Sequence, residues 1–503
     1  MMESFVSCNP ATGEMAETFA ARSPAEVDCA VGQARTLALA WRQRTVQERL
    51  TALRRWRERL AADADRLAMT VSAEIGKPLQ EAFGADLLPS LTGLRWLERE
   101  TAAVLRPRRA GGARLTAEPY GVVGVIGTWN YPLLLNVAPI AWALAAGNAV
   151  VFKPSELAAA SALRLMAHAE AVGLPVVTVT GGGETGQALC RADIDKMAFT
   201  GGVRTGRAIL AELATHNIPA VMELSGNDAF LVCADADIEL AARSAVWGRV
   251  CNAGQSCLAP QRFYVVRERA DAFLRACQQE IETLRAGVDF GPLRTDRLRD
   301  TAHRLVWQAV AQGAELRTGG RCLTELPGFH YAPTLLAECT ESMPIVSQDF
   351  FGPILPVCTV RDAEEAIQRI DASEMALGAS IWTRDVRQGQ ALAARLEVGL
   401  AAINQDTLLL GADPALPFGG LRASGFGRQR GAAGLEEFIH WKVTATGASG
   451  GERRHLFPYR PATVPILRSL LAFQNAPTLW AKLEALRPLA RAAADYQKKN
   501  RRS

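Results

Sequence analysis

Apolar and polar positions alternate in blocks along the chain, and one block has no charged residue from Pro119 to Phe152. Its length would suit a membrane helix. Prolines, glycines and asparagines interrupt it, so it divides into a buried strand at Val122–Ile126, a helix at Leu133–Ala146 and a strand at Ala149–Phe152. This order predicts a βαβ unit in a parallel sheet, with the whole block in the protein core.

The same alternation continues on both sides of this unit. Helical spacing of apolar residues predicts two or three surface helices between Ser23 and Gly76. The other predicted elements are a helix at Asp237–Val250 and strands at Val176–Thr180, Lys196–Phe199, Phe230–Val232 and Arg262–Val266. The series restarts after Ser225, and we therefore predict an α/β fold with two doubly wound parallel-sheet domains.

The composition is typical of globular proteins, because 49% of the 503 residues are hydrophobic and 21% are charged. It excludes a disordered, collagenous or coiled-coil chain. The net charge of +4 is too small to indicate nucleic acid as a partner. Charge is unevenly distributed, since residues 451–503 carry 11 basic and 3 acidic side chains. An acidic body is thus followed by a basic tail.

Residues 455–503 form a predicted basic and apolar C-terminal extension, in which prolines separate apolar patches. One interpretation is a helix that packs on the body and ends in a frayed basic terminus. The other is a peripheral contact with a membrane surface or a partner.

Ten cysteines are scattered along the chain without a C-x-x-C pair. This spacing fits neither a zinc motif nor a disulfide framework, so we expect no metal and a reducing compartment, the cytoplasm. The first residues, Met1–Pro10, contain no apolar stretch, and we expect no signal peptide.

Glycine-rich loops compete for a phosphate-binding role. Gly181–Gly186 fits G-x-G-x-x-G between a strand and a helix but lacks the acidic residue expected about 20 positions later. Gly121–Gly127 is not followed by a helix start. Phe199–Gly206 also follows a strand and opens a helix, whose free N–H groups suit an anion. The pattern alone does not choose between the first and the third loop.

Cys257 ends the polar, glycine-containing stretch Asn252–Cys257, which makes it a candidate nucleophile. The alternative is a buried structural cysteine. None of the six histidines lies in a recognisable Cys–His motif. Glu223, just after an apolar strand, is a candidate base, and its alternative is a solvated strand-end glutamate.

Eight motifs in one order resemble the NAD(P)-dependent aldehyde dehydrogenase superfamily from about residue 5 to residue 445. Ala259-Pro260 and the apolar tail are most similar to the class 3 branch, which acts on medium-chain and fatty aldehydes. The motifs are Thr128–Pro132, Lys153–Glu156, Phe199–Gly206, Glu223–Gly226, Asn252–Cys257, Phe351–Pro353, Pro417–Gly420 and Ser424–Arg428.

The resemblance implies an aldehyde as the small-molecule substrate and a carboxylic acid as the product. Cys257 would attack the aldehyde carbon, for which the site must lower the thiol pKa or supply a base. The Asn130 amide and the Cys257 N–H would bind the oxyanion of the thiohemiacetal. After hydride transfer leaves a thioester, Glu223 would activate the water that hydrolyses it.

The resemblance also implies a dinucleotide site. The pyrophosphate would meet the helix that begins near Gly201–Gly206, with Gly181–Gly186 nearer the adenine side. A carboxylate at Glu156 would accept from both ribose hydroxyls and repel a 2′-phosphate, so we expect NAD, with NADP as the alternative. The implied cofactor-binding residues are Trp129, Lys153, Glu156, Gly201, Gly202, Gly206, Asp349 and Phe351.

Four positions depart from the family pattern. Thr128 stands where proline is common, and Ser225 replaces a glycine. Gly202 replaces a serine, which removes a hydroxyl donor to phosphate. Asp349 replaces a glutamate that holds the nicotinamide ribose; it is one methylene shorter, which predicts looser nicotinamide placement.

The resemblance further implies domain boundaries and a homodimer or homotetramer as the oligomeric state. The expected parts are a dinucleotide-binding domain at 1–104 and 120–222, a catalytic domain at 223–418, and an oligomerisation element at 105–119 and 436–448.

The substrate pocket would be lined near Trp129, Leu133, Leu134 and Asp406–Gly411, which favours aliphatic or aromatic aldehydes. Two alternatives remain. One is a CoA-acylating aldehyde dehydrogenase, which usually lacks the equivalent of Glu223. The other is a non-catalytic protein that has kept the dehydrogenase fold.

Overall fold

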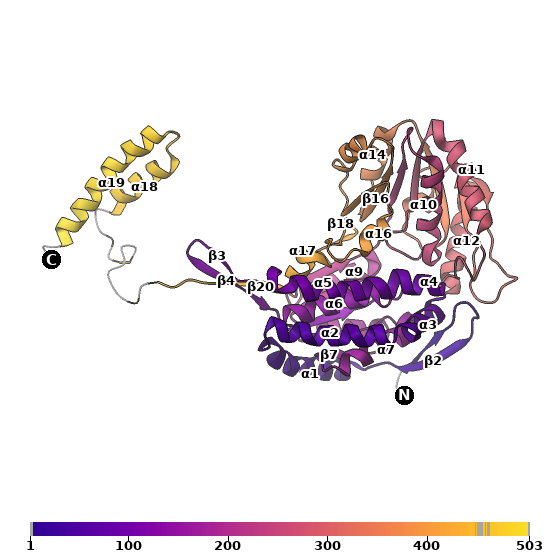
Figure 1. Cartoon of the computed structure of the whole chain (residues 1–503), viewed down its shortest axis with the longest axis horizontal. Coiled ribbons are helices and arrows are strands. Elements are labelled where there is room, and N and C mark those ends of the chain that lie inside the picture. Colours follow the sequence, from indigo (N-terminus) through magenta and orange to yellow (C-terminus); the bar gives the residue numbers. More distant parts are fainter. Residues whose placement is uncertain (1–3, 448, 450–455, 458, 460–462, 501–503) are drawn as a thin grey trace. The chain divides into compact units, whose positions relative to one another are not determined.

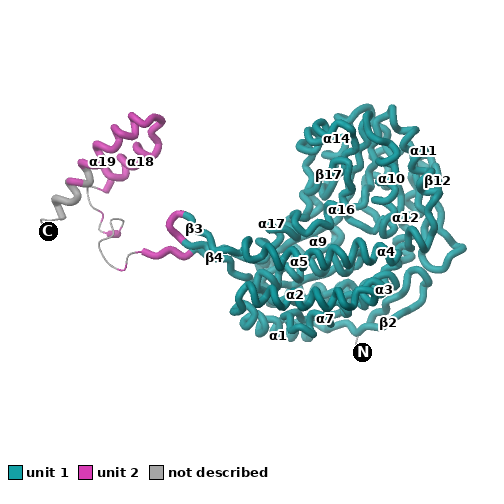
Figure 2. Tube along the Cα trace, in the orientation of Figure 1, with its two compact units in different colours: residues 1–110, 114–443 teal, residues 111–113, 444–503 magenta. Residues whose placement is uncertain are grey.

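The computed structural model describes residues 4–447, 449, 456–457, 459 and 463–500. Their contacts form two compact units, which have different colours in Figure 2. One unit comprises Met1–Ala110 and Arg114–Val443, and the other comprises Gly111–Ala113 and Thr444–Ser503. Both predicted sheets lie in the first unit.

The first sheet forms around the predicted βαβ unit. Its strands have the order β19-β9-β8-β5-β6-β7, with β19 antiparallel to β9 and the other neighbours parallel. Every residue of β5, β6 and the intervening α6 (Leu134–Ala146) is buried, which confirms that the uncharged block is core. The strands are β5 (Val122–Ile126), β6 (Ala149–Lys153), β7 (Val176–Thr178), β8 (Lys196–Thr200), β9 (Ala220–Glu223) and β19 (Gly425–Phe426).

Helices cover both faces of this sheet (Figure 1). Val123 and Val125 of β5 share a core cluster with α2, α3, α5, α6 and α7, whereas Val122 and Ile126 share another with α1, α8 and α9. Alternate residues of a strand point to opposite faces, so the sheet is doubly wound as predicted. The helices are α1 (Pro24–Arg42), α2 (Val46–Ala62), α3 (Ala64–Ile75), α5 (Leu88–Val104), α7 (Ala159–Glu170), α8 (Gly183–Arg191) and α9 (Val203–Ala214).

The first helices start where side chains can cap them. Ser23 and Thr45 accept from the backbone N–H of Glu26 and Glu48, whose carboxylates bond back to the capping residues. The predicted strand at Val176–Thr180 is two residues shorter, because Thr180 instead bonds the chain that leads into α1 through its carbonyl and hydroxyl.

The second sheet has the order β12-β13-β14-β11-β10-β16-β17, with β12 antiparallel to β13. Its faces belong to different core clusters, one containing Leu231 and Tyr264 and the other Phe230 and Phe263. Its strands are β10 (Ala229–Val232), β11 (Arg262–Val266), β12 (Glu315–Thr318), β13 (Thr334–Ala337), β14 (Ile354–Val360), β16 (Gly378–Trp382) and β17 (Leu400–Ile403). Its helices are α10 (Ile238–Val250), α11 (Arg267–Thr283), α12 (Asp296–Ala311), α13 (Pro344–Ser347), α14 (Ala363–Asp371), α15 (Val386–Ala393) and α16 (Thr407–Ala412).

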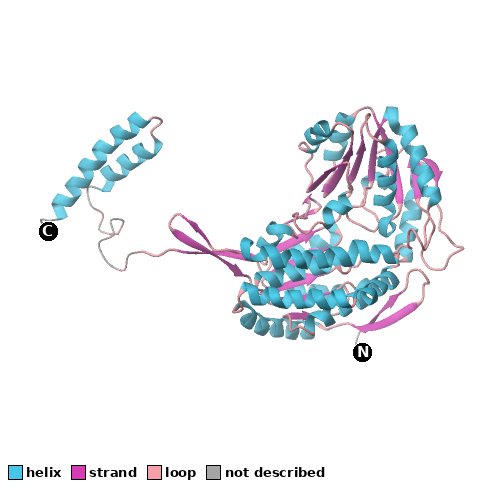
Figure 3. Cartoon of the chain, viewed as in Figure 1, coloured by secondary structure: helices cyan, strands magenta, loops and turns pink. Residues whose placement is uncertain are grey.

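Smaller strands complete the fold, as the secondary-structure colours of Figure 3 show. One small sheet has the order β20-β4-β3, so it joins the chain near residue 110 to the chain near residue 440. Another pairs β1 with β2. The bounds are β1 (Ser4–Cys8), β2 (Met15–Ala20), β3 (Arg108–Ala110), β4 (Ala113–Pro119), β15 (Met375–Ala376), β18 (Leu421–Arg422) and β20 (Ile439–Thr444). Short helices are α4 (Leu79–Glu81), the π-helix η1 (Ala82–Leu87), the 3-10 helices η2 (Glu156–Ala158) and η3 (Cys251–Gly254), and α17 (Gly431–Glu436).

The C-terminal extension contains two helices in its described part, α18 (Thr463–Asn475) and α19 (Leu479–Asn500), which contact each other. Parts of predicted segments lie outside the described residues, namely 1–3, 448, 455, 458, 460–462 and 501–503. Many apolar side chains of the two helices are exposed, including Leu479 (76%) and Trp480 (75%). None of the described helices is long and apolar enough to cross a membrane.

Candidate active site

The sheet topology brings the predicted site residues to one region. In the first sheet, the carboxyl ends of β5, β8 and β9 lead to Asn130, Gly202 and Glu223. Parallel strands present these ends at one edge of the sheet, which is where such folds bind ligands. In the second sheet, Cys257 and Phe351 precede the neighbouring strands β11 and β14. All five residues line a single cavity of about 250 Å³.

Hydrogen bonds at both ends orient the Asn130 side-chain amide. Thr128 Oγ1 donates to Asn130 Oδ1 (3.0 Å), and Asn130 Nδ2 donates to the Gln255 carbonyl (3.0 Å). Lys77 Nζ and Asn252 Nδ2 donate to the Asn130 carbonyl (2.8 and 2.9 Å). The amide is therefore tied to the loop that contains the candidate nucleophile, and Thr128 contributes a bond that a proline could not.

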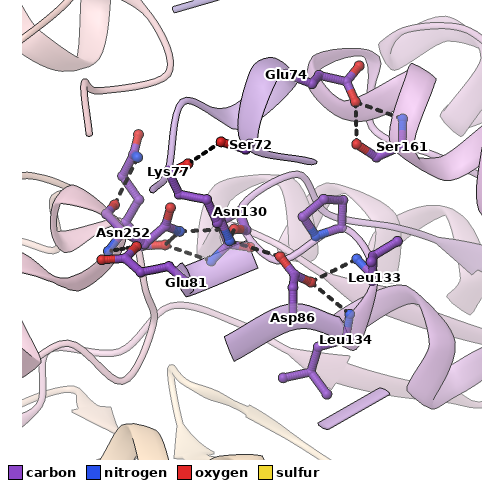
Figure 4. Close-up of polar contacts among 12 residues, drawn as sticks. Ser72, Glu74, Lys77, Glu81, Asp86, Asn130, Leu133, Leu134, Ser161 and Asn252 are labelled. Carbon is purple, nitrogen blue, oxygen red and sulfur yellow. Dashed lines mark hydrogen bonds and ion pairs between the residues drawn. The ribbon is translucent and has the colours of Figure 1, made fainter. Parts of the chain in front are cut away.

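A buried ion pair holds the same backbone (Figure 4). Lys77 Nζ lies 2.9 Å from Asp86 Oδ2, and neither side chain is exposed. Asp86 Oδ1 accepts from the N–H groups of Leu133 and Leu134, which belong to the start of α6 (2.9 Å each). A buried ion pair is tolerated when its remaining donors and acceptors are also used, as they are at this site.

The loop before Cys257 has left-handed backbone at three consecutive residues. The φ angles are 51° at Asn252, 54° at Ala253 and 72° at Gly254. This conformation is unfavourable for residues with a Cβ. Gly254 meets a second restriction, because a Cβ there would collide with the carbonyl oxygen of Gly352. The loop therefore packs directly on the segment that contains Phe351.

Cys257 lines a second cavity as well, of about 330 Å³. This cavity, which we call the apolar cavity, receives side chains from α6, α10 and α16. Its apolar lining residues are Ala85, Tyr131, Leu134, Leu135, Trp247, Leu258, Leu408, Leu409, Ala412 and Phe418. Cys257 is therefore a lining residue of both cavities.

Burial raises the pKa of the Cys257 thiol to about 12. The carboxyl groups of Asp228, Glu223 and Asp349 raise the pKa further, and Arg430 lowers it. Burial therefore opposes ionisation of this thiol, and Arg430 is the neighbouring group that acts in the opposite direction.

Glu223 is 2% exposed, and neither of its carboxyl oxygens has a hydrogen-bond partner among the described residues. Burial raises its pKa well above the usual range, against the effects of Arg430 and Arg428. Once ionised, a carboxylate with a raised pKa is a stronger base than an exposed one. Glu223 therefore has the environment of a general base rather than that of a solvated strand end.

A third cavity, of about 640 Å³, lies along the carboxyl edge of the first sheet. Both competing glycine loops line it, with Gly182 and Gly183 on one side and Gly201 and Gly202 on the other. A Cβ on Gly182, Gly183 or Gly202 would meet open space, so these backbones face the cavity directly. The start of α9 at Gly202 has no side-chain cap, which leaves its N–H groups available to an anion.

Lys153 and Glu156 line the same cavity, with Lys153 Nζ 3.3 Å from Glu156 Oε2. Trp129 packs edge-on against Phe351 (ring centroids 5.6 Å apart) beside the cavity that contains Glu223. The two cavities share Thr128, Trp129 and Gly201 among their lining residues, and their free N–H groups, lysine and carboxylates are groups that suit a dinucleotide.

Comparison with known proteins decides the family. The model of the aldehyde dehydrogenase family matches residues 2–444. The chain belongs to this family. It is an NAD(P)-dependent aldehyde dehydrogenase, which oxidises an aldehyde to the carboxylic acid with reduction of NAD(P).

Individual relatives agree with this assignment. A 4,4'-diapolycopene aldehyde oxidase from a Methylomonas species is 36% identical over 480 residues, which are 92% of this chain and 88% of that protein. Aldehyde dehydrogenase from Mycobacterium tuberculosis, solved with NAD+, has a TM-score of 0.86 at 30% identity and covers 90% of this chain and 96% of its own. An NADP-dependent enzyme from E. coli has a TM-score of 0.85 at 29% identity, covering 89% and 95%.

Asp349, which the motif resemblance predicts to be a departure from the family pattern, lies among polar side chains. Its carboxyl accepts from Gln261 Nε2 (3.4 Å). Burial raises its pKa, and Ser225 lowers it. The carboxyl is thus held within the protein at the edge of the cavity that it lines with Phe351.

Some residues of the site were missed or misplaced by the sequence. Trp129 and Leu133 do not line the apolar cavity, because Trp129 faces the dinucleotide cavities and Leu133 packs in the core. Leu134 and the segment Asp406–Gly411 do contribute to it, as expected. Lys77, Asp86 and Arg430 were not identified. Whether a charged side chain is buried at these positions depends on contacts with residues distant in the sequence. The only signal for this burial in the sequence was the presence of charged residues inside apolar segments.

Proposed function

We propose that Cys257 is the nucleophile of this aldehyde dehydrogenase, with Asn130 and Glu223 as its partners. The observation that carries this proposal is the position of Cys257 between the apolar cavity and the cavity that contains Asn130 and Glu223. An aldehyde chain in the apolar cavity would present its carbonyl at the sulfur. The dinucleotide would reach the same atom from the other side.

Each step follows from the chemistry of these groups. The Cys257 sulfur bonds to the aldehyde carbon, and the oxyanion that forms accepts from the Asn130 amide and the Cys257 N–H. Removal of such a donor typically costs about 10²–10³ in rate. Bound NAD(P) supplies the hydride acceptor. Glu223 then removes a proton from the water that attacks the thioester, so the acid leaves and the thiolate is restored.

The chain would hold the dinucleotide through residues of both sheets. Gly201, Gly202 and Gly206 would present the start of α9 to the pyrophosphate, and Trp129, Asp349 and Phe351 would surround the nicotinamide ribose. Lys153 and Glu156 would hold the adenosine ribose hydroxyls, and the carboxylate favours NAD over NADP. We propose the domain boundaries on the same basis, with residues 1–104 and 120–222 binding the dinucleotide and residues 223–418 carrying the nucleophile.

The apolar cavity supports an apolar aldehyde as the substrate, aliphatic or aromatic. The Methylomonas relative is named for its action on 4,4'-diapolycopene aldehyde, and we include this aldehyde among the substrates to be tested. Glu223 argues against CoA as the acyl acceptor, since water depends on a base far more than a thiol does, whose pKa is about 8.5.

The test is NADH or NADPH formation across aldehydes of increasing chain length, together with aromatic and polyene aldehydes. We expect turnover of apolar aldehydes with a preference for NAD, lost in Cys257→Ala. Unchanged turnover in Cys257→Ala would remove the proposed nucleophile. A preference for short, charged aldehydes would remove the proposed substrate class.

We also propose a homodimer or homotetramer that assembles through residues 105–119 and 436–448. The small sheet β20-β4-β3 presents strands with exposed residues, including Val443 (64%), and edge strands readily pair with another chain. Light scattering should give a dimer or tetramer mass, and Val443→Pro should lower it. A monomer at micromolar concentration would contradict this proposal.

The ten cysteines, all unpaired, support the cytoplasm as the compartment.

The C-terminal extension has features of a peripheral membrane contact. Exposed Leu479 and Trp480 accompany a net charge of +8 over residues 451–503. Apolar and basic groups together favour anionic lipid surfaces. The full chain should sediment with vesicles of phosphatidylcholine and phosphatidylserine, and Trp480→Glu or removal of residues 456–503 should abolish this. Vesicle binding by these variants that equals that of the full chain would overturn the proposal. An extension that associates with itself, in a full chain that binds no lipid, would also overturn it.

A further inference from the structure

Arg430 combines three features that each oppose folding. Its backbone is left-handed (φ 61°), a conformation that suits glycine rather than a residue with a side chain. It is 3% exposed. Its Nε and Nη1 have no hydrogen-bond partner among the described residues. A buried guanidinium without partners is costly, so a position with all three features is unusual for a purely structural arginine.

The backbone fixes where this side chain goes. The N–H groups of Gln429 and Phe418 each donate to the other residue's carbonyl (2.7 Å), and the Arg430 carbonyl accepts from Gly434 (2.8 Å). The guanidinium carbon lies 4.6 Å from the centre of the Phe418 ring. Both side chains line the apolar cavity together with Cys257. Arg430 is therefore held at the cavity that the aldehyde would enter.

Most of the other titratable groups around Cys257 are carboxyl groups. Asp228, Glu223 and Asp349 face it from the chain near β9, β10 and β14, and Glu81 lines the same cavity. Arg430 itself faces Glu223, Cys257 and Asp413.

Neighbouring cations are engaged elsewhere. Arg428 donates to the carbonyls of Gly420 and Gly427, and Lys77 pairs with Asp86. Arg430 is thus the cation near the sulfur that, among the described residues, has no bonded partner of its own.

We propose that Arg430 is a positioning residue that stabilises Cys257 as the thiolate before the aldehyde binds. A neighbouring guanidinium favours a thiolate, and its effect is strongest where water is excluded. The unfavourable backbone and burial of Arg430 then have a function, since they hold an unpaired cation against an otherwise acidic and apolar site. This inference rests on Cys257 being the proposed nucleophile.

The test measures thiol ionisation without turnover. The full chain is treated with iodoacetamide, a neutral alkylating agent, at a series of pH values, and labelling of the Cys257 peptide is followed by mass spectrometry. The variants are Arg430→Gly, Arg430→Gln and Arg430→Lys. Arg422→Gly is the matched control, because Arg422 is also left-handed (φ 53°) and lies in the same glycine-rich segment but outside the apolar cavity.

We expect Arg430→Gly to raise the pH at which Cys257 labelling is half-maximal. Each pH unit of this increase should make labelling at pH 8 about tenfold slower. Its melting temperature should stay equal or rise, because glycine relieves the backbone and removes a buried charge. Arg430→Gln should shift the midpoint in the same direction, Arg430→Lys should keep most of the wild-type reactivity, and Arg422→Gly should leave the midpoint unchanged.

An unchanged labelling midpoint in both Arg430→Gly and Arg430→Gln would overturn the inference, whatever their turnover. A midpoint shift of the same size in Arg422→Gly would also overturn it, since the effect would then be general. Failure of the proposed function would give a different result. Cys257 would still be reactive, and its reactivity would still depend on Arg430, but aldehyde turnover would not require Cys257.

Discussion

At the scale of single residues, the site is defined by groups that the fold leaves without partners. The two Glu223 oxygens and the Arg430 guanidinium are buried and unbonded among the described residues, next to a thiol whose pKa is raised by burial. In a stable core such groups are normally paired. In the proposed mechanism, water would be the partner of Glu223, and the Cys257 thiolate would be that of Arg430.

Replacement of Glu223 by Gln should separate the two halves of the reaction. The amide cannot take a proton from water, so we expect steady turnover to fall by about 10²–10⁴. The first turnover should still release about one equivalent of NADH per active site, since thioester formation precedes hydrolysis. Stopped-flow absorbance would show this burst, and its loss together with steady turnover would mean that Glu223 also acts on the thiol.

Asp349→Glu tests the departure at the nicotinamide ribose. The longer side chain should reach the ribose hydroxyls, and we expect a lower KM for NAD, with KM for the aldehyde little changed. Initial rates at varied NAD concentrations measure this. If KM for NAD and kcat both stay the same, the shorter carboxylate does not loosen nicotinamide placement.

At the scale of elements, function depends on loops packed against loops. The Cys257 loop contacts the segment before β14 through Gly254, and the segment after β5 is held through Lys77, Asp86 and Asn252. Each tie joins elements from different parts of the chain. Asn130 and the Cys257 N–H, the proposed oxyanion donors, are therefore positioned by the packing of these elements rather than by any one of them.

Gly254→Ala should damage both stability and activity, because the new Cβ meets the Gly352 carbonyl as well as a left-handed backbone. Gly287→Ala is a matched control, since Gly287 has a similar φ (79° against 72°) and open space around its Cβ. We expect the control to cost about 1 kcal/mol in unfolding free energy and to keep its activity. If urea unfolding gives the same loss of unfolding free energy in both variants, and both keep their activity, the contact between Gly254 and Gly352 has no special role.

At the scale of the whole molecule, the site makes the protein less stable as pH rises. Asp228 is 1% exposed, and burial raises its pKa from 3.8 to about 7. Glu81, also with a pKa of about 7, and Glu223 change in the same direction. The folded state therefore binds more protons than the unfolded state between about pH 4 and pH 7, and stability falls as pH increases through this range.

Asp228→Asn should reduce this pH dependence. The amide oxygen can still accept from the Gly378 N–H (2.9 Å in the native chain), and the group no longer ionises. We expect the variant to gain stability relative to the native chain at pH 8, by on the order of 4 kcal/mol at most, and to gain little at pH 4. Urea unfolding at the two pH values measures the difference. The same gain at both would show that ionisation of Asp228 is not its cause.

The sequence by itself determined the class of fold, the family and the main chemistry. Periodicity located the strands and helices because burial of apolar side chains is a local pattern, as β5, α6 and β6 show. Cys257, Glu223 and Asn130 could be singled out because their chemistry is carried by short motifs.

Only the tertiary structure decided which segments share a cavity. The two glycine loops follow β7 and β8, and they line one site because the sheet has the order β8-β5-β6-β7, which no local pattern specifies. Lys77 reaches the Asn130 carbonyl and Asp86 reaches the start of α6 through contacts between residues far apart in the chain. The cost of burying a charge depends on everything that surrounds it, and for this reason the sequence indicated Cys257, the proposed nucleophile, but not Arg430 beside the same cavity.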